Sequence, residues 1–148
     1  MKISAWHKAK GAMVKLIKLN LKRGEQINFG CTLPDKVYAS IVFKKNKHAL
    51  DYLVSACPNI PIDIGGSGNS LTKELPDYIE NIKPDYSLYP DYDYSLGFSS
   101  RGCFRKCFFG VVDKKERGFR RTQHPSEWYD PKFKDITFLD NNIFADKA

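Results

Sequence analysis

Hydrophobic positions in the first part of the chain alternate between a helical and a strand spacing. The apolar residues of 3–10 fall on one face of a helix, and Gly11 is placed to end it. From residue 13 to residue 21, apolar and polar side chains alternate, which predicts a strand. The nearly continuous apolar run 37–43 is typical of a strand that is covered on both faces.

The same pattern continues to residue 82. It predicts a helix over 46–56, a short strand over 60–64 and a second helix over 76–82, which begins with proline. A glycine-rich turn, residues 65–68, follows the short strand. Strand, helix, strand, glycine turn and helix is the order of an open parallel α/β sheet, so we expect a partial parallel sheet here.

The second part of the chain begins with a segment rich in proline, tyrosine and aspartate. Residues 84–93 therefore predict a connector, and a brief strand over 94–99 follows it. One or two helical turns are expected over 125–129 and a strand over 135–139. The chain opens on a helix, and another helix begins near residue 143, so we expect a truncated protein whose sheet lacks its first strand.

Composition restricts the class of protein. The chain has 148 residues, which suits one ordinary domain or two very small ones. With 42% hydrophobic and 28% charged residues, wholesale disorder is not expected. No apolar run approaches the roughly 20 residues that cross a bilayer, and no apolar stretch follows the first residues as in a secretory signal. We therefore expect a cytoplasmic protein with no membrane partner.

The net charge of +7 raises the question of an acidic partner. Most lysines are spread along the chain, and the one dense basic patch, residues 114–121, is interrupted by an acid and a glycine. A solvated basic surface is the simpler interpretation. Binding of nucleic acid is the alternative.

Four cysteines are present, and two of them are closely spaced. Cys31 and Cys57 are isolated and are interpreted as ordinary thiols. Cys103 and Cys107 lie four residues apart, and such spacing in a cytosolic chain more often indicates metal binding or redox chemistry than a disulfide. A third cysteine at position 110 would complete the spacing C-x3-C-x2-C, but Gly110 stands there.

The neighbours of the two cysteines suit thiolate ligands. Thiolates bind iron–sulfur clusters because soft sulfur matches iron and carries the charge of the cluster. Arg101 and Lys106 would offset negative thiolate charge, and Gly102 would allow close approach of the backbone. A cationic setting also lowers the pKa of a thiol and favours its ligand form.

Residues 97–112, with the sequence GFSSRGCFRKCFFGVV, resemble the cluster loop of radical S-adenosylmethionine (radical SAM) proteins. In that family the first strand of a partial (β/α) barrel leads into C-x3-C-xΦ-C. Three cysteines hold a [4Fe-4S] cluster, and the open iron binds S-adenosylmethionine for reductive cleavage. The resemblance implies that Cys103 and Cys107 are metal ligands and that Phe109 lies beside the adenine as a cofactor-binding residue. Gly110 occupies the third ligand position.

The flanking segments extend this resemblance. Residues 65–68 and 84–86 are similar to parts of the cobalamin-binding-like (flavodoxin-like) domain that precedes the barrel in one branch of the family, and 136–142 to the second barrel strand. The resemblance implies a cobalamin-binding-like α/β domain over 1–90 and the N-terminal fragment of a radical SAM barrel over 91–148.

Cobalamin itself is not expected. The corrinoid motif of that domain is D-x-H-x-x-G, and His7 is neither preceded by the aspartate nor followed by the glycine, because Ala5 and Lys10 stand at those positions. His7 is therefore interpreted as a surface residue of the first helix.

Three further positions leave alternatives open. Asp140 follows a strand, where α/β folds place ligand-binding groups, so it is a candidate cofactor-binding residue; a helix N-cap is the other interpretation. Residues 65–68 are either a tight turn or an anion-binding loop, although the lysine of a P-loop is missing. His124 could join the two cysteines in a zinc site, but regular four-ligand spacing is absent.

The sequence therefore predicts a radical SAM-like iron–sulfur protein that is degenerate or incomplete, and whether it is an enzyme stays open. S-adenosylmethionine would be its small-molecule partner, and a second chain could complete the barrel. The alternative is a non-catalytic basic binding module whose aromatic and basic residues, such as Phe104, Phe108 and Arg121, stack on single-stranded nucleic acid.

Overall fold

The structure is a computed structural model, in which the described residues are 1–19, 27–30, 32–116 and 118–145. The chain forms two compact units, and each is described by itself. The central unit is Ile17–Glu74, and the terminal unit combines Met1–Leu16 with Leu75–Ala148. The expected domain boundary between residues 90 and 91 falls inside the terminal unit.

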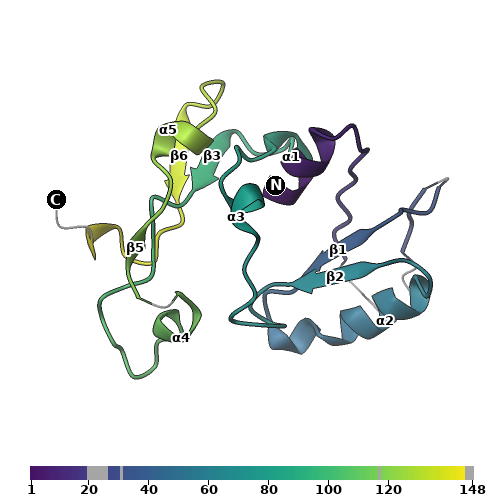
Figure 1. Ribbon diagram of the computed structural model, residues 1–148, viewed down its shortest axis with the longest axis horizontal. Coiled ribbons are helices and arrows are strands. Elements are labelled where there is room, and N and C mark those ends of the chain that lie inside the picture. The colour runs from purple at the N-terminus through teal and green to yellow at the C-terminus, as the bar shows by residue number, and fades with distance from the viewer. Residues whose placement is uncertain (20–26, 31, 117, 146–148) are drawn as a thin grey trace. The chain divides into compact units, whose positions relative to one another are not determined.

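The central unit contains a β-α-β arrangement. Strands β1 (Val37–Ser40) and β2 (Ile62–Gly65) pair in parallel, and helix α2 (His48–Ala56) connects them after a short 3-10 turn, η1 (Lys44–Asn46) (Figure 1). Parallel neighbours require a crossover connection, which α2 supplies. Both strands and the helix were predicted from the apolar pattern, and the parallel pairing is confirmed.

The apolar face of α2 forms the core of this unit. The buried residues are Ile41, Leu50, Leu53 and Cys57, and the side chains of the two strands pack against them. Cys57 is only 2% exposed, which agrees with its interpretation as an ordinary core thiol.

The glycines after β2 serve a close approach between backbone segments. Gly66 has a φ of +91°, and a Cβ atom on it would lie 2.2 Å from the carbonyl oxygen of Ile41. The backbone N–H of Gly68 donates to the same oxygen at 2.8 Å. No helix begins directly after this turn, since the next helix starts at Asp77. The tight-turn interpretation therefore accounts for these glycines.

The prediction of a strand over 13–21 is wrong for residues 13–19, the part of this range that the structure describes. Residues 13–19 contain no strand, and residues 20 and 21 lie outside the described residues. The side chain of Met13 is 98% exposed, and Leu16 and Leu19 are also exposed. Alternation alone does not create a strand where no neighbouring strand offers hydrogen bonds.

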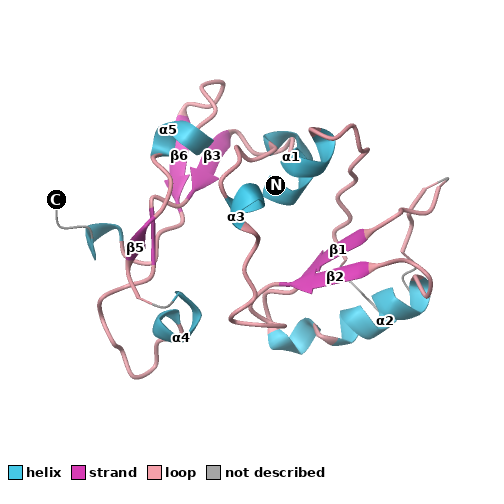
Figure 2. Ribbon diagram, in the orientation of Figure 1, coloured by secondary structure: helices cyan, strands magenta, loops and turns pink. Residues whose placement is uncertain are grey.

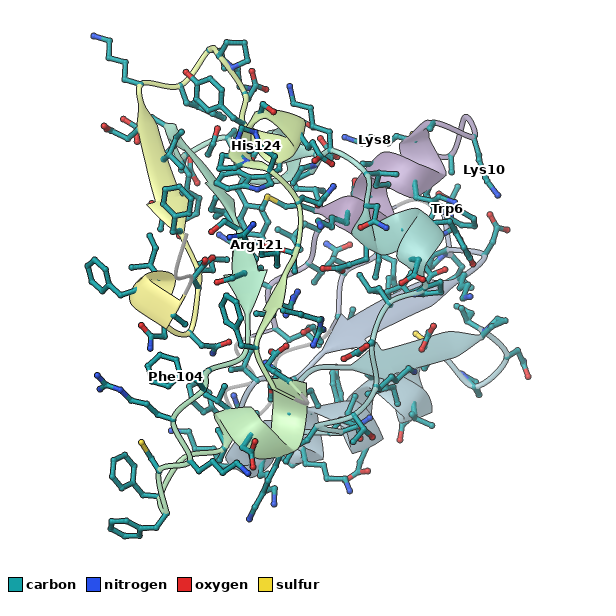
Figure 3. The ribbon with its side chains drawn as sticks, turned by 60° about the vertical axis from the view of Figure 1, so that its left-hand side comes forward. Trp6, Lys8, Lys10, Phe104, Arg121 and His124 are labelled. Carbon is teal, nitrogen blue, oxygen red and sulfur yellow. The ribbon has the colours of Figure 1, made fainter. Side chains whose placement is uncertain are left out.

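The terminal unit begins with helix α1 (Lys2–Lys8), which packs against helix α3 (Asp77–Glu80). The rings of Trp6 and Tyr78 lie 5.8 Å apart between the two helices. The ammonium group of Lys10 lies 3.7 Å from the centre of the Trp6 ring, and both residues are labelled in Figure 3. Both helices were expected from the sequence.

A second pair of parallel strands forms the centre of the terminal unit. Strand β3 (Tyr94–Gly97) pairs with β6 (Asp135–Phe138), and helix α5 (Pro125–Trp128) lies over them (Figure 1). Trp128 is 1% exposed, and a Cβ atom on Gly97 would lie 2.4 Å from its ring. Close contact between strand and helix thus requires glycine at position 97.

Tyr86 fixes the connector to this pair of strands. It lies in the 3-10 turn η2 (Tyr86–Leu88) and is 7% exposed. Its hydroxyl group donates to the carbonyl oxygen of Trp128 at 2.8 Å and accepts from the backbone N–H of Leu96 at 3.2 Å. Burial raises the pKa of Tyr86 above its ordinary value, so the phenol stays protonated and available as a donor.

Three elements were not predicted. Strands β4 (Ser100–Arg101) and β5 (Arg120–Arg121) form a short antiparallel ladder, and helix α4 (Val112–Glu116) lies between them in the sequence. Loops make up most of this region (Figure 2). The last described element is the 3-10 turn η3 (Ile143–Ala145).

The described part of the chain is thus a mixed α/β structure of small parallel and antiparallel sheets, which is compatible with a partial α/β fold. None of its helices has the length and apolar character needed to cross a membrane.

The carboxylate of Asp85 joins the connector to α1. It accepts hydrogen bonds from Ser4 Oγ at 2.5 Å, Lys8 Nζ at 2.8 Å and Ser87 Oγ at 2.6 Å. Burial alone would raise the pKa of Asp85, but these hydrogen bonds outweigh it, so the pKa lies well below its usual range.

We expect Asp85→Asn to lower the free energy of unfolding by about 2 kcal/mol at pH 7, because hydrogen bonds to a charged group are lost. The folded chain binds the Asp85 proton more weakly than the unfolded chain does. The stabilisation is therefore complete above the unfolded pKa of about 4 and declines as the pH falls below it.

Urea unfolding of the parent chain and of the Asp85→Asn variant at pH 7 and pH 3 checks this expectation. The control is Asp51→Asn, which removes a carboxylate that is exposed on α2. An equal loss of stability at both pH values would show that the charge of Asp85 is not responsible.

Candidate functional site

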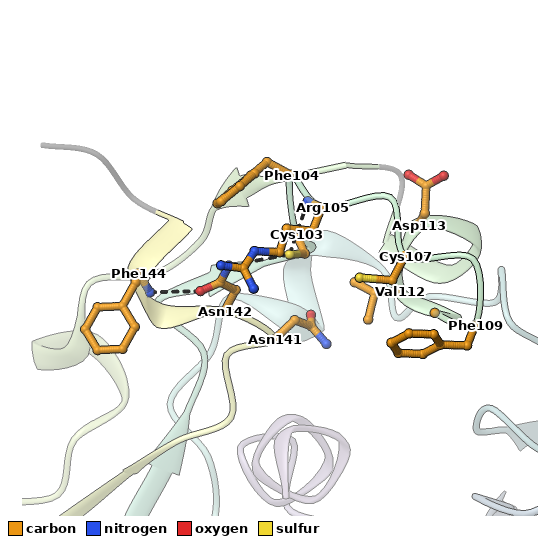
Figure 4. Close-up of a pocket in the computed structure, with 11 residues that line it drawn as sticks. Cys103, Phe104, Arg105, Cys107, Phe109, Val112, Asp113, Asn141, Asn142 and Phe144 are labelled. Carbon is orange, nitrogen blue, oxygen red and sulfur yellow. Dashed lines mark hydrogen bonds between the residues drawn. The ribbon is translucent and has the colours of Figure 1, made fainter.

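The two closely spaced cysteines lie in a loop that follows the β3 and β4 strands. We call residues 102–111 the cysteine loop. Both thiols are free, and both line one open pocket of about 490 Å³ (Figure 4). The pocket is lined by the cysteine loop, the start of α4 and the residues after β6, namely Cys103, Phe104, Arg105, Cys107, Phe109, Gly110, Val112, Asp113, Asn141, Asn142 and Phe144.

Asp140 holds the segment that leads into this loop. Its carboxylate accepts hydrogen bonds from the backbone N–H groups of Ser99 and Ser100, both at 2.9 Å. It also accepts from their hydroxyl groups, at 2.6 Å and 2.8 Å. Three of these donors reach Oδ2 and one reaches Oδ1. Asp140 therefore holds the chain itself in place, and its assignment as a cofactor-binding residue stays a prediction.

The two residues after Asp140 continue the same series of contacts. Asn141 Oδ1 accepts from the backbone N–H of Gly102 at 3.1 Å, and Asn142 Nδ2 donates to the Cys103 sulfur at 3.5 Å. We call residues 140–142 the DNN clamp. The clamp fixes the start of the cysteine loop to the end of β6, residue by residue.

Gly102 and Gly118 close the base of the loop. Gly102 has a φ of +80°, and a Cβ atom on it would lie 1.9 Å from the carbonyl oxygen of Gly118. Any other residue at position 102 would meet both backbone strain and direct overlap. Close approach of the backbone was expected at Gly102, and the segment that approaches it is the backbone at Gly118.

The environment of Cys103 favours its thiolate. The backbone N–H of Arg105 donates to Cys103 Sγ at 3.4 Å, and Asn142 donates to the same atom. These two hydrogen bonds, followed by the charge of Arg105, lower the pKa of the Cys103 thiol below its ordinary value. The Cys103 thiol is therefore more easily ionised than an ordinary cysteine thiol.

Arg101 does not contribute its charge to the thiols. Its guanidinium group pairs with Glu80 at 2.9 Å and with the buried Glu116 at 3.4 Å. It also lies over the ring of Phe98, 4.0 Å from its centre. Arg101 was expected to offset thiolate charge. Its guanidinium group instead pairs with carboxylates at the base of α4, where it has a structural role.

Cys107 is exposed and begins a turn that Gly110 ends. The backbone N–H of Gly110 donates to the carbonyl oxygen of Cys107 at 2.9 Å. A Cβ atom on Gly110 would lie 3.4 Å from the Cβ atom of Cys107, and the φ of Gly110 is outside the left-handed region. The backbone could therefore carry a side chain at position 110, beside that of Cys107.

The exposed aromatic residues surround the two thiols. Phe104, Phe108 and Phe109 are 57%, 99% and 76% exposed. Phe109 lines the pocket, and its place beside an adenine stays a prediction. Phe108 does not line the pocket, and its ring packs edge-on against Phe109 with 5.0 Å between the centres.

In the described part of the chain, no three thiolates lie together as ligands of one cluster. Among the described residues there is no group of three or more His, Cys, Asp or Glu side chains that could hold a metal ion. His124 caps helix α5, accepting from the backbone N–H of Ser126 at 3.3 Å, and is well separated from Phe104 in Figure 3. Cys57 is a core residue of the central unit, and Cys31 lies outside the described residues.

Sequence reasoning missed Asn141, Asn142 and Arg105 as residues of this site. The run Asp140-Asn141-Asn142 was a usable signal, because three short polar side chains in succession after a strand can each accept or donate to a neighbouring loop. Their partners, however, lie about 40 residues earlier in the chain.

Comparison of the chain with protein-family models, with curated proteins and with solved structures found no match.

Asp140→Ala is expected to destabilise the protein by about 3 kcal/mol, because the backbone groups of Ser99 and Ser100 lose their partner in a partly buried place. Denaturant unfolding measures the change. Unchanged stability, together with loss of a bound metal, would instead identify Asp140 as a ligand.

Three glycine-to-alanine variants test the base of the loop. We expect Gly102→Ala to cost about 3 kcal/mol, because left-handed strain adds to the overlap with Gly118. Gly11→Ala has the same strain but open space around it, so a cost of about 1 kcal/mol is expected. Gly110→Ala has no such strain and should change the unfolding free energy by about 0.5 kcal/mol or less. Equal effects of the three variants in thermal or urea unfolding would contradict the assigned contact.

Proposed function

We propose that this chain is a degenerate iron–sulfur protein of the radical SAM type, in which two of the three cluster ligands remain and S-adenosylmethionine is not cleaved. The observation that carries the proposal is the placement of Cys103 and Cys107. Both thiols line one pocket, in a loop that the end of a parallel strand pair holds in place.

The order of elements supports this proposal. Strand β3 leads into the cysteine loop, helix α5 follows, and β6 returns to pair with β3 in parallel. A (β/α) barrel begins with this order of strand, helix and neighbouring parallel strand, and places its functional loops after the strands. The parallel β1–β2 pair in the central unit is compatible with a cobalamin-binding-like domain, and its corrinoid motif is missing at His7.

The ligand count argues against catalysis. A bound [4Fe-4S] cluster would supply the electron for reductive cleavage of S-adenosylmethionine, and it needs three thiolates and one open iron. Gly110 supplies no thiolate. The aromatic residue proposed to lie beside the adenine, Phe109, is 76% exposed, so the described residues do not enclose a nucleoside there.

A partner chain fits the remaining edge of the sheet. All four residues of β6 are exposed, and in the described part of the chain β6 pairs with β3 alone. Exposed strand edges favour pairing with a further strand. The proposal therefore includes a second chain that adds barrel strands beside β6.

One observation favours a second candidate function, a basic binding module for single-stranded nucleic acid. The ring of Phe108 is 99% exposed, and two cations, Arg105 and Lys106, lie three and two residues before it in the cysteine loop. Bases stack on exposed aromatic rings, and cations hold the phosphate backbone. Salt-dependent retention on single-stranded nucleic acid, lost in Phe108→Ala, would favour this candidate over the iron–sulfur protein.

Restoring the third ligand tests the leading proposal. Anaerobic reconstitution with iron and sulfide is expected to give Gly110→Cys clearly more bound iron and stronger charge-transfer absorption than the parent chain. The physical reason is that a Cβ atom at position 110 lies beside that of Cys107, so the new thiol adds to the existing pair.

Gly110→Ser is the matched control, because it adds a side chain of similar size without a thiolate. Equal iron and sulfide in the parent chain and in both variants would mean that position 110 is not the missing ligand. The proposed relationship to the radical SAM cluster loop would then be wrong.

A further inference from the structure

The pair of thiols in the pocket is itself a complete ligand set for one kind of ion. We infer that Cys103 and Cys107 form a two-coordinate site for a single Cu(I) ion. This inference goes beyond the proposed function, since one ion takes the place of a cluster and neither S-adenosylmethionine nor a third ligand is involved.

The ligand type and number select the ion. Soft thiolates favour Cu(I), zinc and iron–sulfur clusters, whereas Mg²⁺ and Ca²⁺ require oxygen ligands. Structural zinc takes four protein ligands. Asp113 also lines the pocket, but the described residues contain no group of three or more His, Cys, Asp or Glu side chains that could hold a metal ion. Cu(I) differs because it is satisfied by two thiolates in an approximately linear arrangement.

The geometry of the pocket suits a bridging ion. Both cysteines line the same cavity, and in Figure 4 the side chain of Cys107 points towards Cys103. Cys103 is held by hydrogen bonds from the Arg105 backbone and from Asn142. Cys107 lies in the exposed part of the loop, where it can adjust to the ion.

The charges of the loop balance the complex. Binding replaces two thiol protons, which pass to solvent, with one Cu(I), so two Cu–S bonds form and no electron is transferred. The product carries a net charge of −1. Arg105, which lines the pocket, and the exposed Lys106 supply two positive charges beside it, and Asp113, which also lines the pocket, supplies one negative charge. Arg101 is already paired with carboxylates.

Asn142 acts as a positioning residue in this site. Its side-chain amide donates to the Cys103 sulfur at 3.5 Å and does not need to touch the ion. Groups that orient a metal ligand through a hydrogen bond typically change metal affinity when they are removed. Asn142→Ala should therefore weaken Cu(I) binding roughly tenfold while leaving one ion per chain.

The test is anaerobic competition for Cu(I) between the full-length reduced chain and a chromogenic Cu(I) chelator, followed by X-ray absorption of the complex. Cys31→Ser is introduced as the background so that this thiol does not contribute. One Cu(I) per chain with two sulfur neighbours is expected. Cys103→Ser and Cys107→Ser should each abolish competition, whereas Cys57→Ala, which removes a core thiol of the central unit, should retain it.

Circular dichroism of each variant shows whether it is folded, and Asn142→Ala provides a graded change that does not depend on losing a ligand. Retention of Cu(I) by either serine variant, more than one ion per chain, or three sulfur neighbours would overturn the two-thiolate site. Failure of Gly110→Cys to gain iron while the parent binds one Cu(I) would refute the radical SAM relationship alone. The opposite result would refute the copper site alone.

Discussion

The carboxylate of Asp140 is the contact on which the rest of the terminal unit depends. It brings the end of β6 to the end of β3 by accepting from both backbone and side-chain donors of Ser99 and Ser100. Buried backbone groups require hydrogen-bond partners. The Asp140 carboxylate supplies this partner to the backbone N–H groups of Ser99 and Ser100, where the chain leaves the two-stranded sheet. Asn141 and Asn142 then form hydrogen bonds with Gly102 and Cys103. The strand pair therefore determines the position of the Cys103 thiol.

Ion pairs around α4 neutralise part of the chain's excess positive charge. Glu116 is buried and forms ion pairs with Arg101 at 3.4 Å and Arg120 at 3.7 Å. A buried carboxylate requires such compensation, because desolvation would otherwise be costly. Part of the patch at 114–121 is therefore neutralised within the chain and is not available to a polyanion. Beside the thiols, Arg105 and Lys106 carry positive charge and Asp113 carries negative charge.

Most regular elements could be predicted from the sequence, because their signals are local. The apolar periodicity of α2 and the β-branched runs of β1 and β6 are read within a few neighbouring residues. The β4–β5 ladder could not be found in this way, since it depends on the approach of Gly102 to Gly118. The prediction of a strand from residue 13 was wrong for the opposite reason. The local pattern was present, but no neighbouring strand pairs with the described residues of that segment. At the site, both cysteines were found by spacing, whereas the role of Asp140 depended on donors 40 and 41 residues away.

The contact between Gly102 and Gly118 has a consequence for how such a protein changes over time. The close approach of Gly102 to Gly118 joins the start of the cysteine loop to the chain that follows α4. A residue such as the one at position 110 can then be replaced without disturbing the sheet below. Substitution of an exposed residue of the cysteine loop therefore leaves the contact between Gly102 and Gly118 and the strand pair in place.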